Sequence, residues 1–133
     1  MRLSVVCAIT AGVAAVLGVA AVAPPAYAIK PFYVELEAKY VKPDSTEQND
    51  IALMIAFEQA GCTICHPGDD KHKLTRYGGQ LAWRINKFDK WNKKKIQEAF
   101  DEVGALRSDP YDPKSPTYGE LFRQGKLPPN PMC

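Results

Sequence analysis

The sequence predicts an all-α fold, and three observations support that prediction. After residue 28, apolar side chains recur every three or four residues in several segments, as they do on one face of a helix. Clusters of proline, glycine and aspartate separate these segments. No segment alternates apolar and polar residues for long enough to build a β-sheet. Residues 29–133 therefore have the length and pattern of one small helical domain with a modest core.

Residues 1–28 have the features of a secretory signal peptide. Arg2 supplies a positive charge, an uncharged run rich in alanine and valine follows, and a small-x-small cleavage pattern ends at Ala28. An uncleaved anchor is the alternative, because about 20 apolar residues can span a bilayer. The prolines before the cleavage pattern favour cleavage. We therefore predict a signal peptide over 1–28 and a mature domain over 29–133. The mature domain is expected in the periplasm or an equivalent compartment, without stable membrane insertion.

The first helix of the mature domain is predicted over residues 29–41. Pro31 suits the first helical turn, because its missing N–H has no partner there in any case. Apolar side chains then follow at four-residue spacing on one face: Phe32, Leu36 and Tyr40.

A second helix is predicted over residues 48–60. Ser45 or Thr46 is the expected cap, because both follow a proline-containing turn and carry a hydroxyl. The dense apolar content of this segment predicts a helix that is buried on most sides. Gly61 follows it and allows the chain to bend.

Two further helices are predicted after a polar loop and a Tyr-Gly-Gly break. The third covers residues 80–88 and is expected to bury Leu81, Ile85 and Phe88, with Trp83 at its edge. The fourth covers residues 90–106, with Asp89 as its cap. Its buried stripe is expected to hold four residues: Ile96, Ala99, Phe100 and Val103.

A short last helix is predicted to begin at residues 115–117. It carries three apolar residues for the core: Tyr118, Leu121 and Phe122. Gly125 ends it, and a proline-rich tail follows.

One short motif in the bend after the second helix carries specific chemistry. Its residues are Cys62-Thr63-Ile64-Cys65-His66. Two cysteines at this spacing with an adjoining histidine are typical of covalent attachment of haem c. Each thiol adds to one haem vinyl group, and His66 becomes the proximal ligand of the iron. The predicted export agrees, since this haem is attached outside the cytoplasm.

Three other interpretations of the motif are weaker. A thioredoxin-like pair sits between a strand and a helix, and no strand is predicted before Cys62. A structural zinc site needs four ligands, and the sequence has no second pair to complete the set. A structural disulfide would close a very short loop, and the position of His66 directly after Cys65 would then be a coincidence.

The net charge of the mature domain favours neither a nucleic acid nor a strongly charged partner, and no nucleic-acid partner is predicted. Without Arg2 the mature domain has sixteen basic and fifteen acidic side chains, a net charge of +1. This balance gives no basic field for binding a polyanion. Lys71, Lys73 and Arg76, in the loop after the motif, are candidates for steering an acidic redox partner, although Asp69 and Asp70 dilute this patch.

With these residues in view, the chain resembles a small monohaem cytochrome c of the class I type. It resembles more closely a set of small exported cytochromes of planctomycete-type bacteria. The likeness lies in the haem motif, the Lys-Pro-Asp-Ser turn at 42–45, the Tyr-Gly at 77–78 and the segment 115–121. The resemblance implies that the helices over 48–60 and 90–106 pack against each other beside the haem.

Two departures from class I cytochromes leave the distal side of the haem open. The usual proline whose carbonyl orients the proximal histidine is absent, so another group must do this. No methionine lies between His66 and Pro131. Candidates for the distal ligand are therefore Met132 and Cys133 in the tail, and Met54 in the second helix. The resemblance includes cytochromes with His/Cys ligation. His72 is expected to be a loop histidine, and a five-coordinate haem remains open.

The sequence thus predicts a soluble one-electron carrier with a transient redox-protein partner. The alternative is a gas-binding or sensing haem protein with a vacant, labile or thiolate distal site, and the missing internal methionine motivates it. Thiol–disulfide exchange is a third reading, which predicts a chain without covalent haem. No nucleophile and base can be paired, so the sequence does not predict an enzyme.

Overall fold

The computed structural model describes residues 29–68 and 70–130. The predicted signal peptide and the tail residues Met132 and Cys133 lie outside this range. The described part contains five α-helices and two short 3₁₀ helices, and its one β-type pairing is an isolated bridge between Arg107 and Thr117. The predicted all-α class is therefore confirmed for the described residues.

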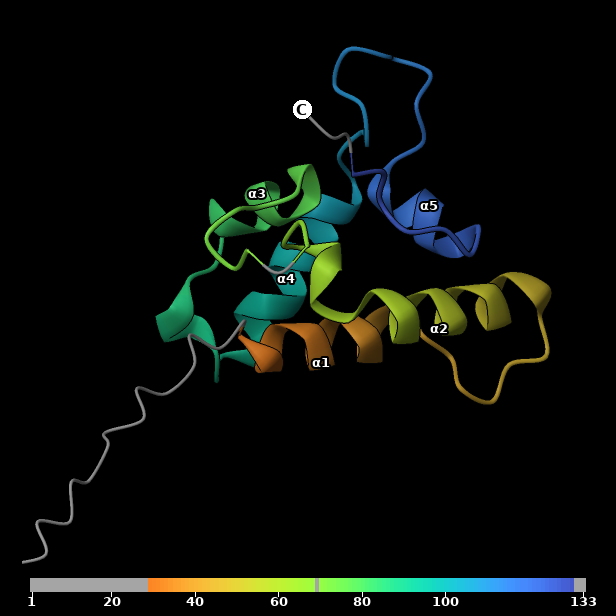
Figure 1. The fold of residues 1–133 in the computed structure, drawn as a ribbon, viewed down its shortest axis with the longest axis horizontal. Helices are drawn as coiled ribbons and strands as arrows, with labels where there is room; N and C mark the ends of the chain where they lie inside the picture. The colour runs from red at the N-terminus through yellow and green to blue at the C-terminus, as the bar shows by residue number, and fades with distance from the viewer. Residues whose placement is uncertain (1–28, 69, 131–133) are drawn as a thin grey trace, which may run out of the picture.

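The helices are joined by turns and by two longer loops, one after η1 and one before α5 (Figure 1). In chain order they are α1 (Lys30–Tyr40), α2 (Gln48–Ala60), η1 (Gly61–Ile64), α3 (Arg76–Ala82), η2 (Lys87–Asp89), α4 (Lys93–Gly104) and α5 (Tyr118–Arg123).

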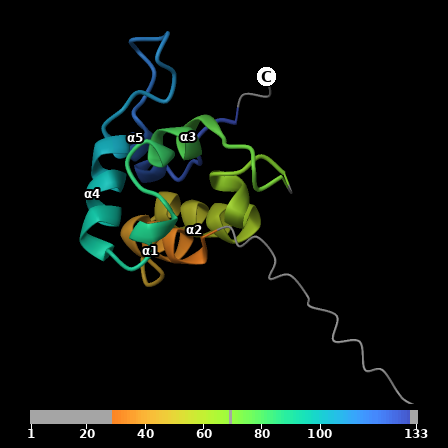
Figure 2. The ribbon, with the colours of Figure 1, turned by 90° about the vertical axis from the view of Figure 1, so that its left-hand side faces the viewer.

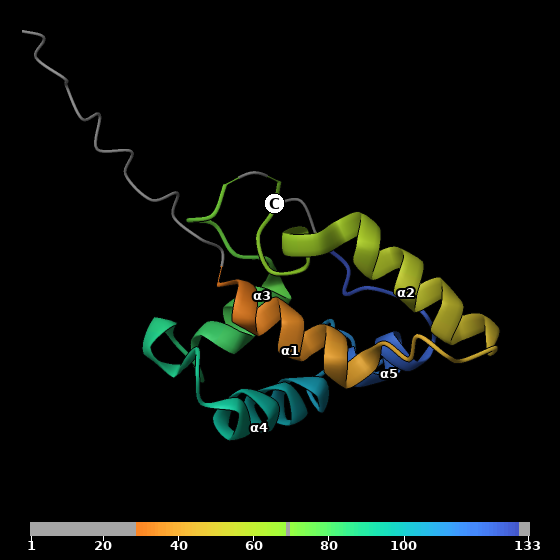
Figure 3. The ribbon, with the colours of Figure 1, turned by 90° about the horizontal axis from the view of Figure 1, so that it is seen from below.

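Helix α4 forms the centre of the arrangement. It contacts α1, α3 and α5, whereas α2 lies against α5 (Figures 1 and 3). Helices α1 and α4 run in the same direction, because Lys93 Nζ pairs with Glu35 at 3.0 Å and Lys39 Nζ pairs with Asp101 at 2.7 Å. The close packing of α2 against α4 that the cytochrome resemblance implied is not seen in the described helices. α1 takes that place beside α4 instead.

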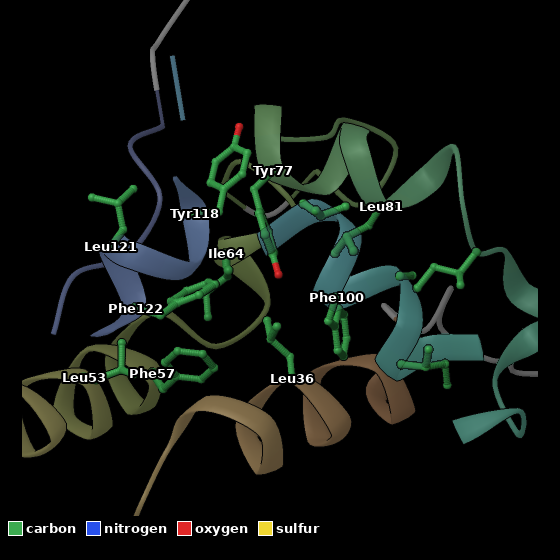
Figure 4. Close-up of a cluster of buried hydrophobic side chains, with 14 residues drawn as sticks. Leu36, Leu53, Phe57, Ile64, Tyr77, Leu81, Phe100, Tyr118, Leu121 and Phe122 are labelled. Carbon is green, nitrogen blue, oxygen red and sulfur yellow. The ribbon is translucent and has the colours of Figure 1, made fainter. Parts of the chain in front are cut away.

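Aromatic rings from all five α-helices pack in or against the core, which aliphatic side chains complete (Figure 4). Phe122 lies at the centre, with its ring centroid 4.3 Å from Tyr40, 5.9 Å from Phe57 and 5.6 Å from Tyr77. Tyr77 also meets Tyr118 edge to face at 5.1 Å. Such contacts add to the stability gained from burying the ring area.

Helix α2 has the predicted bounds but not the predicted burial. Only Leu53 and Phe57 are buried, and Ile51 and Ile55 are exposed. The reason is that α2 packs along one side, against α5, and its other side faces solvent. The predicted cap is also wrong. Glu47 is the N-cap residue, and Ser45 instead accepts a hydrogen bond from the Glu47 N–H and donates one to Asp50.

The prediction for residues 80–88 is wrong in its bounds. Helix α3 begins at Arg76, so the Tyr-Gly-Gly segment lies inside the helix, and the helix ends at Ala82. Leu81 and Ile85 are buried as predicted, but Phe88 belongs to η2 and is exposed. The predicted cap role of Asp89 is wrong too, since Asp89 closes the η2 capping box and Asn92 caps α4.

The predicted buried residues of α4 and α5 are confirmed, although α4 is shorter at both ends than the predicted 90–106 and α5 ends at Arg123, before the predicted end at Gly125. The four residues of the predicted α4 stripe are all buried, and Tyr118, Leu121 and Phe122 of α5 are buried as well. Thr117 caps α5 in a capping box with Glu120, which satisfies two backbone N–H groups at the start of this short helix. Within the described residues, no helix has the length and apolar character needed to cross a bilayer.

Candidate functional site

A pocket of about 300 Å³ opens between the start of α1, the motif and α3. Both cysteines of the motif and His66 line it. The rest of its wall is almost entirely apolar, and it includes the following side chains: Phe32, Leu36, Ile64, Leu74, Leu81, Ile85 and Phe100. A pocket of this size and character suits a flat apolar cofactor or ligand.

The motif is placed by the end of α2. Gly61 has a φ of +50°, a left-handed conformation that favours glycine, and the chain turns there into η1. The η1 turn carries Cys62, and Cys65 follows directly, with the N–H groups of Cys65 and His66 both donating to the Cys62 carbonyl. This short turn is why both sulfurs and the imidazole reach the same pocket.

The two thiols differ in their surroundings. Cys62 is exposed, whereas Cys65 is half-buried against the core. Burial raises the pKa of the Cys65 thiol to about 12, with a smaller contribution from the neighbouring Cys62. Cys65 is therefore a protonated thiol at neutral pH in the free chain.

The His66 ring is held in a defined tautomer by a backbone carbonyl. Its Nδ1 lies 2.8 Å from the carbonyl oxygen of Lys73. A carbonyl can only accept, so Nδ1 carries the hydrogen and donates it, and Nε2 keeps its lone pair. This is the arrangement by which a second group orients a metal-binding histidine. Lys73 thus supplies the orienting carbonyl that the sequence left unassigned.

Thr75 ties the loop after the motif back to the motif itself. Its N–H donates to the Cys65 carbonyl at 2.9 Å, and its buried hydroxyl donates to the Ile64 carbonyl at 2.8 Å. The same hydroxyl oxygen accepts from the Gly78 N–H at 3.0 Å and so caps α3. These three hydrogen bonds fix where the Lys73 carbonyl stands relative to His66.

Gly78 allows α3 to lie directly on the motif. A β-carbon at this position would be 2.3 Å from the Cys65 carbonyl oxygen, a distance that no side chain tolerates. The Tyr-Gly-Gly segment looked like a break between helices in the sequence. In the structure the first of its two glycines is the contact residue between α3 and the motif.

Of the candidates for a distal iron ligand, none that the structure describes lines the pocket. Met54 is half-buried on α2 and His72 is exposed in the loop after the motif. Met132 and Cys133 lie outside the described residues. The other polar residues of the pocket wall are Lys30, Tyr33 and Asn86. The Tyr33 hydroxyl donates to the Phe57 carbonyl, and burial raises its pKa.

Two of the alternative readings of the motif fit the geometry poorly. In residues 29–68 and 70–130, no three metal-binding side chains gather into a cluster, which a zinc site would need. The motif follows the carboxyl end of α2, where the helix dipole is negative and disfavours a thiolate.

Sequence reasoning found the motif but missed the residues that support it. The Lys73 carbonyl carries no sequence signal, because every residue has a carbonyl group. Thr75 could have been found, since threonine is one of the residues preferred at the start of a helix. No known protein family, curated protein or solved structure matches this chain.

Proposed function

We propose that this chain is a periplasmic monohaem c-type cytochrome that carries single electrons. One observation carries the proposal: Cys62, Cys65 and His66 line one apolar pocket, with the His66 Nδ1 already bound to a carbonyl. Haem c, when bound, supplies an iron that alternates between Fe(II) and Fe(III).

The residues of the pocket fit this group. The Cys62 and Cys65 sulfurs are free to form the two thioether bonds, and the lone pair on His66 Nε2 is available for iron. The apolar walls from α1, α3 and α4 keep water from most of the porphyrin surface and so favour the less charged iron state. Lys30 and Asn86 provide the polar groups of the wall that suit the carboxylates of a haem.

The test is production of the full chain in a host that matures c-type cytochromes. We expect the denatured protein to keep the absorption of haem. Its mass should equal that of the chain from Ile29 onward plus one haem. Replacing Cys62 or Cys65 by alanine should leave a single thioether bond, and replacing both should abolish covalent haem. His66→Ala should change the ligand spectrum, whereas the matched control His72→Ala should not.

A colourless native protein with two thiols or one disulfide at positions 62 and 65 would overturn this proposal. It would favour thiol–disulfide exchange, the third reading of the motif. A cleavage site other than Ala28 would change only the predicted mature start.

A gas-binding or sensing haem protein is the second candidate. The observation that favours it is the composition of the pocket wall. Neither Met54 nor His72 is among the described residues that line the pocket. A ferrous spectrum that carbon monoxide leaves unchanged supports the carrier, because both axial positions are then filled by strong ligands. Ready binding of the gas supports the second candidate. The same spectra of Met132→Ala and Cys133→Ala would show whether the tail supplies the distal ligand.

A further inference from the structure

We propose that the connection between α3 and α4 is the docking face for an acidic redox partner protein. We call it the aromatic turn and define it by five exposed residues: Trp83, Lys87, Phe88, Lys90 and Trp91. The partner's role as electron donor or acceptor rests on the proposed function, but the existence of the docking face does not.

The turn exposes large apolar side chains that the fold does not use. Trp83, Phe88 and Trp91 are 87%, 83% and 78% exposed, although they lie within nine residues of one another. Surface apolar residues are common singly, but a group of this size marks an interaction site. Tryptophan is also the residue most enriched among those that dominate binding energy at protein interfaces.

The turn is rigid although it contains no long helix. Asn86 and Asp89 form a capping box around η2, in which Asn86 accepts from the Phe88 N–H and Asp89 accepts from the Asn86 N–H. Lys95 Nζ reaches the Asp89 carboxylate at 2.9 Å from the first turn of α4. Ile85, only 4% exposed, anchors the turn in the core. A preorganised face loses little conformational entropy when it binds.

The Asn92 N–H donates to the Asp89 carbonyl, so the chain continues past η2 in another tight turn. Phe88 and Trp91 are three residues apart along this segment, and so are Lys87 and Lys90, which is the spacing at which side chains share a face of a 3₁₀ helix. The ammonium groups lie 5.1 Å and 5.4 Å from the neighbouring ring centroids of Phe88 and Trp91.

The charge of the turn points to an acidic partner. Most nearby basic side chains already have carboxylates: Arg84 with Glu102, Lys93 with Glu35, Lys94 with Glu98 and Lys95 with Asp89. No carboxylate of the described chain pairs with Lys87 or Lys90, whose ammonium groups stand over aromatic rings instead. These two charges are therefore free to meet carboxylates on another protein. Charge complementarity of this kind raises the association rate and suppresses wrong partners.

The turn also lies where an electron-transfer partner has to bind. Ala82, Ile85 and Asn86 line the pocket, and Trp83, Phe88 and Lys87 are their neighbours in the chain. A partner seated on the aromatic turn therefore covers one edge of the pocket. Small transient interfaces are typical of redox encounters.

A membrane surface and a second copy of the chain explain the turn less well. Basic clusters that recognise anionic lipid carry about four to eight lysine or arginine residues, whereas this turn offers two without carboxylate partners. Two copies that met through this turn would place like charges against each other. Neither objection applies to an acidic protein.

The test uses the full holoprotein and an acidic plant-type ferredoxin as probe. Stopped-flow spectroscopy measures how fast reduced ferredoxin reduces the ferric haem at low ionic strength. We expect the triple variant Trp83→Ser/Phe88→Ser/Trp91→Ser to lower the second-order rate constant about tenfold or more. Lys87→Gln/Lys90→Gln should lower it about threefold, and this difference should vanish at high salt.

Two variants outside the turn serve as controls. Tyr111 is 89% exposed in the loop before α5, which Figure 1 places away from the α3–α4 connection. Tyr111→Ser and the double variant Lys114→Gln/Lys126→Gln, at two exposed lysines outside the turn, should both keep the rate within about twofold of the original. Rates that fall as far in these controls as in the turn variants overturn the proposal. So does a triple variant that reacts as fast as the original protein.

Binding without electron transfer separates the two proposals. Oxidised ferredoxin is titrated into isotope-labelled protein, and amide shifts are followed by nuclear magnetic resonance. Shifts centred on residues 83–91 support the docking face even if the protein carries no covalent haem and the proposed function fails. Shifts elsewhere overturn it. The last experiment measures co-sedimentation of the protein with phosphatidylglycerol vesicles. If the original protein binds the vesicles and the triple variant does not, the turn is a membrane-binding surface and the proposal is wrong.

Discussion

Two irregular segments of this chain, the motif with its supporting loop and the aromatic turn, are stabilised in opposite ways. Around Cys65 and Thr75 the backbone is held by buried contacts: the Thr75 hydroxyl donates to the Ile64 carbonyl and accepts from the Gly78 N–H, and α3 lies directly on the Cys65 carbonyl. In the aromatic turn the polar groups hold the backbone and the large apolar side chains face solvent. Substitutions of the buried groups in the first segment should therefore lower the free energy of unfolding. Substitutions of the exposed aromatic side chains in the second should leave it unchanged.

The largest expected effect is at Gly78. Gly78→Ala should lower the free energy of unfolding by about 3 kcal/mol or more, because the new β-carbon overlaps a backbone carbonyl that cannot move aside. Denaturant titration measures it. The matched control is Gly79→Ala, where nothing lies within 4 Å, and there we expect a gain below about 1 kcal/mol. Equal effects at the two glycines would show that α3 does not press on the motif.

Thr75→Val comes next. It removes a buried hydroxyl that donates to the Ile64 carbonyl and caps α3, so we expect a loss of about 2 kcal/mol. Thr63→Val removes a hydrogen bond to the Ala60 carbonyl at an exposed site and should cost about 0.5 kcal/mol or less. Thermal unfolding of both variants checks the order. A loss at Thr63 as large as that at Thr75 would remove the contrast between buried and exposed bonds.

The Tyr77→Phe variant tests whether a buried hydroxyl near the motif lacks a hydrogen-bond partner. Its buried hydroxyl has no hydrogen-bond partner among the residues that the structure describes, and it points toward Leu36 and Phe100 (Figure 4). Because an unpaired buried hydroxyl is costly, Tyr77→Phe should leave the free energy of unfolding unchanged or raise it by up to about 1 kcal/mol. Tyr33→Phe is the control and should lose about 1 kcal/mol, since the Tyr33 hydroxyl donates to the Phe57 carbonyl at 3.1 Å. If Tyr77→Phe lowers the free energy of unfolding of the haem-containing protein, the Tyr77 hydroxyl has a hydrogen-bond partner in that form.

The aromatic turn should be almost neutral in stability. Trp83→Ser, Phe88→Ser and Trp91→Ser should each change the free energy of unfolding by no more than about 0.5 kcal/mol, because these side chains make little contact with the core. A loss above about 2 kcal/mol in any of them, measured by denaturant titration, would mean that the side chain is part of the fold.

The smallest effect is a pH dependence within the turn. Hydrogen bonds from Lys95 and then from the Asn86 N–H hold the pKa of the Asp89 carboxyl below its usual range. A lowered folded pKa gives a stabilisation that is complete above the unfolded value, about 3.9, and is lost as the pH falls through the folded value. The turn should therefore loosen only in strong acid. The two tryptophans of the chain both lie in the turn, so their fluorescence reports it. Asp89→Asn should remove the acid step.

The loop after the motif shows why part of the candidate site could not be read from the sequence. It stands on the opposite side of the fold from α4 (Figure 2) and contributes a backbone carbonyl rather than a side chain. The Tyr-Gly-Gly segment likewise reads as a helix break when only local propensity is considered. Its place inside α3 follows from a threonine cap and from a contact with Cys65, which is close in space but thirteen residues away in sequence.

The sequence by itself determined the helical class, the bounds of α2, the buried stripe of α4, the buried residues of α5 and the position of the Cys-x-x-Cys-His motif. These are local properties, set by spacing, capping and side-chain chemistry within a few residues. Only the tertiary structure decided that α1 rather than α2 lies along α4, that the Lys73 carbonyl orients His66, and that Phe88 faces solvent. The physical reason is that each of these depends on which surfaces meet, and the helical period alone does not specify the partner of an apolar face.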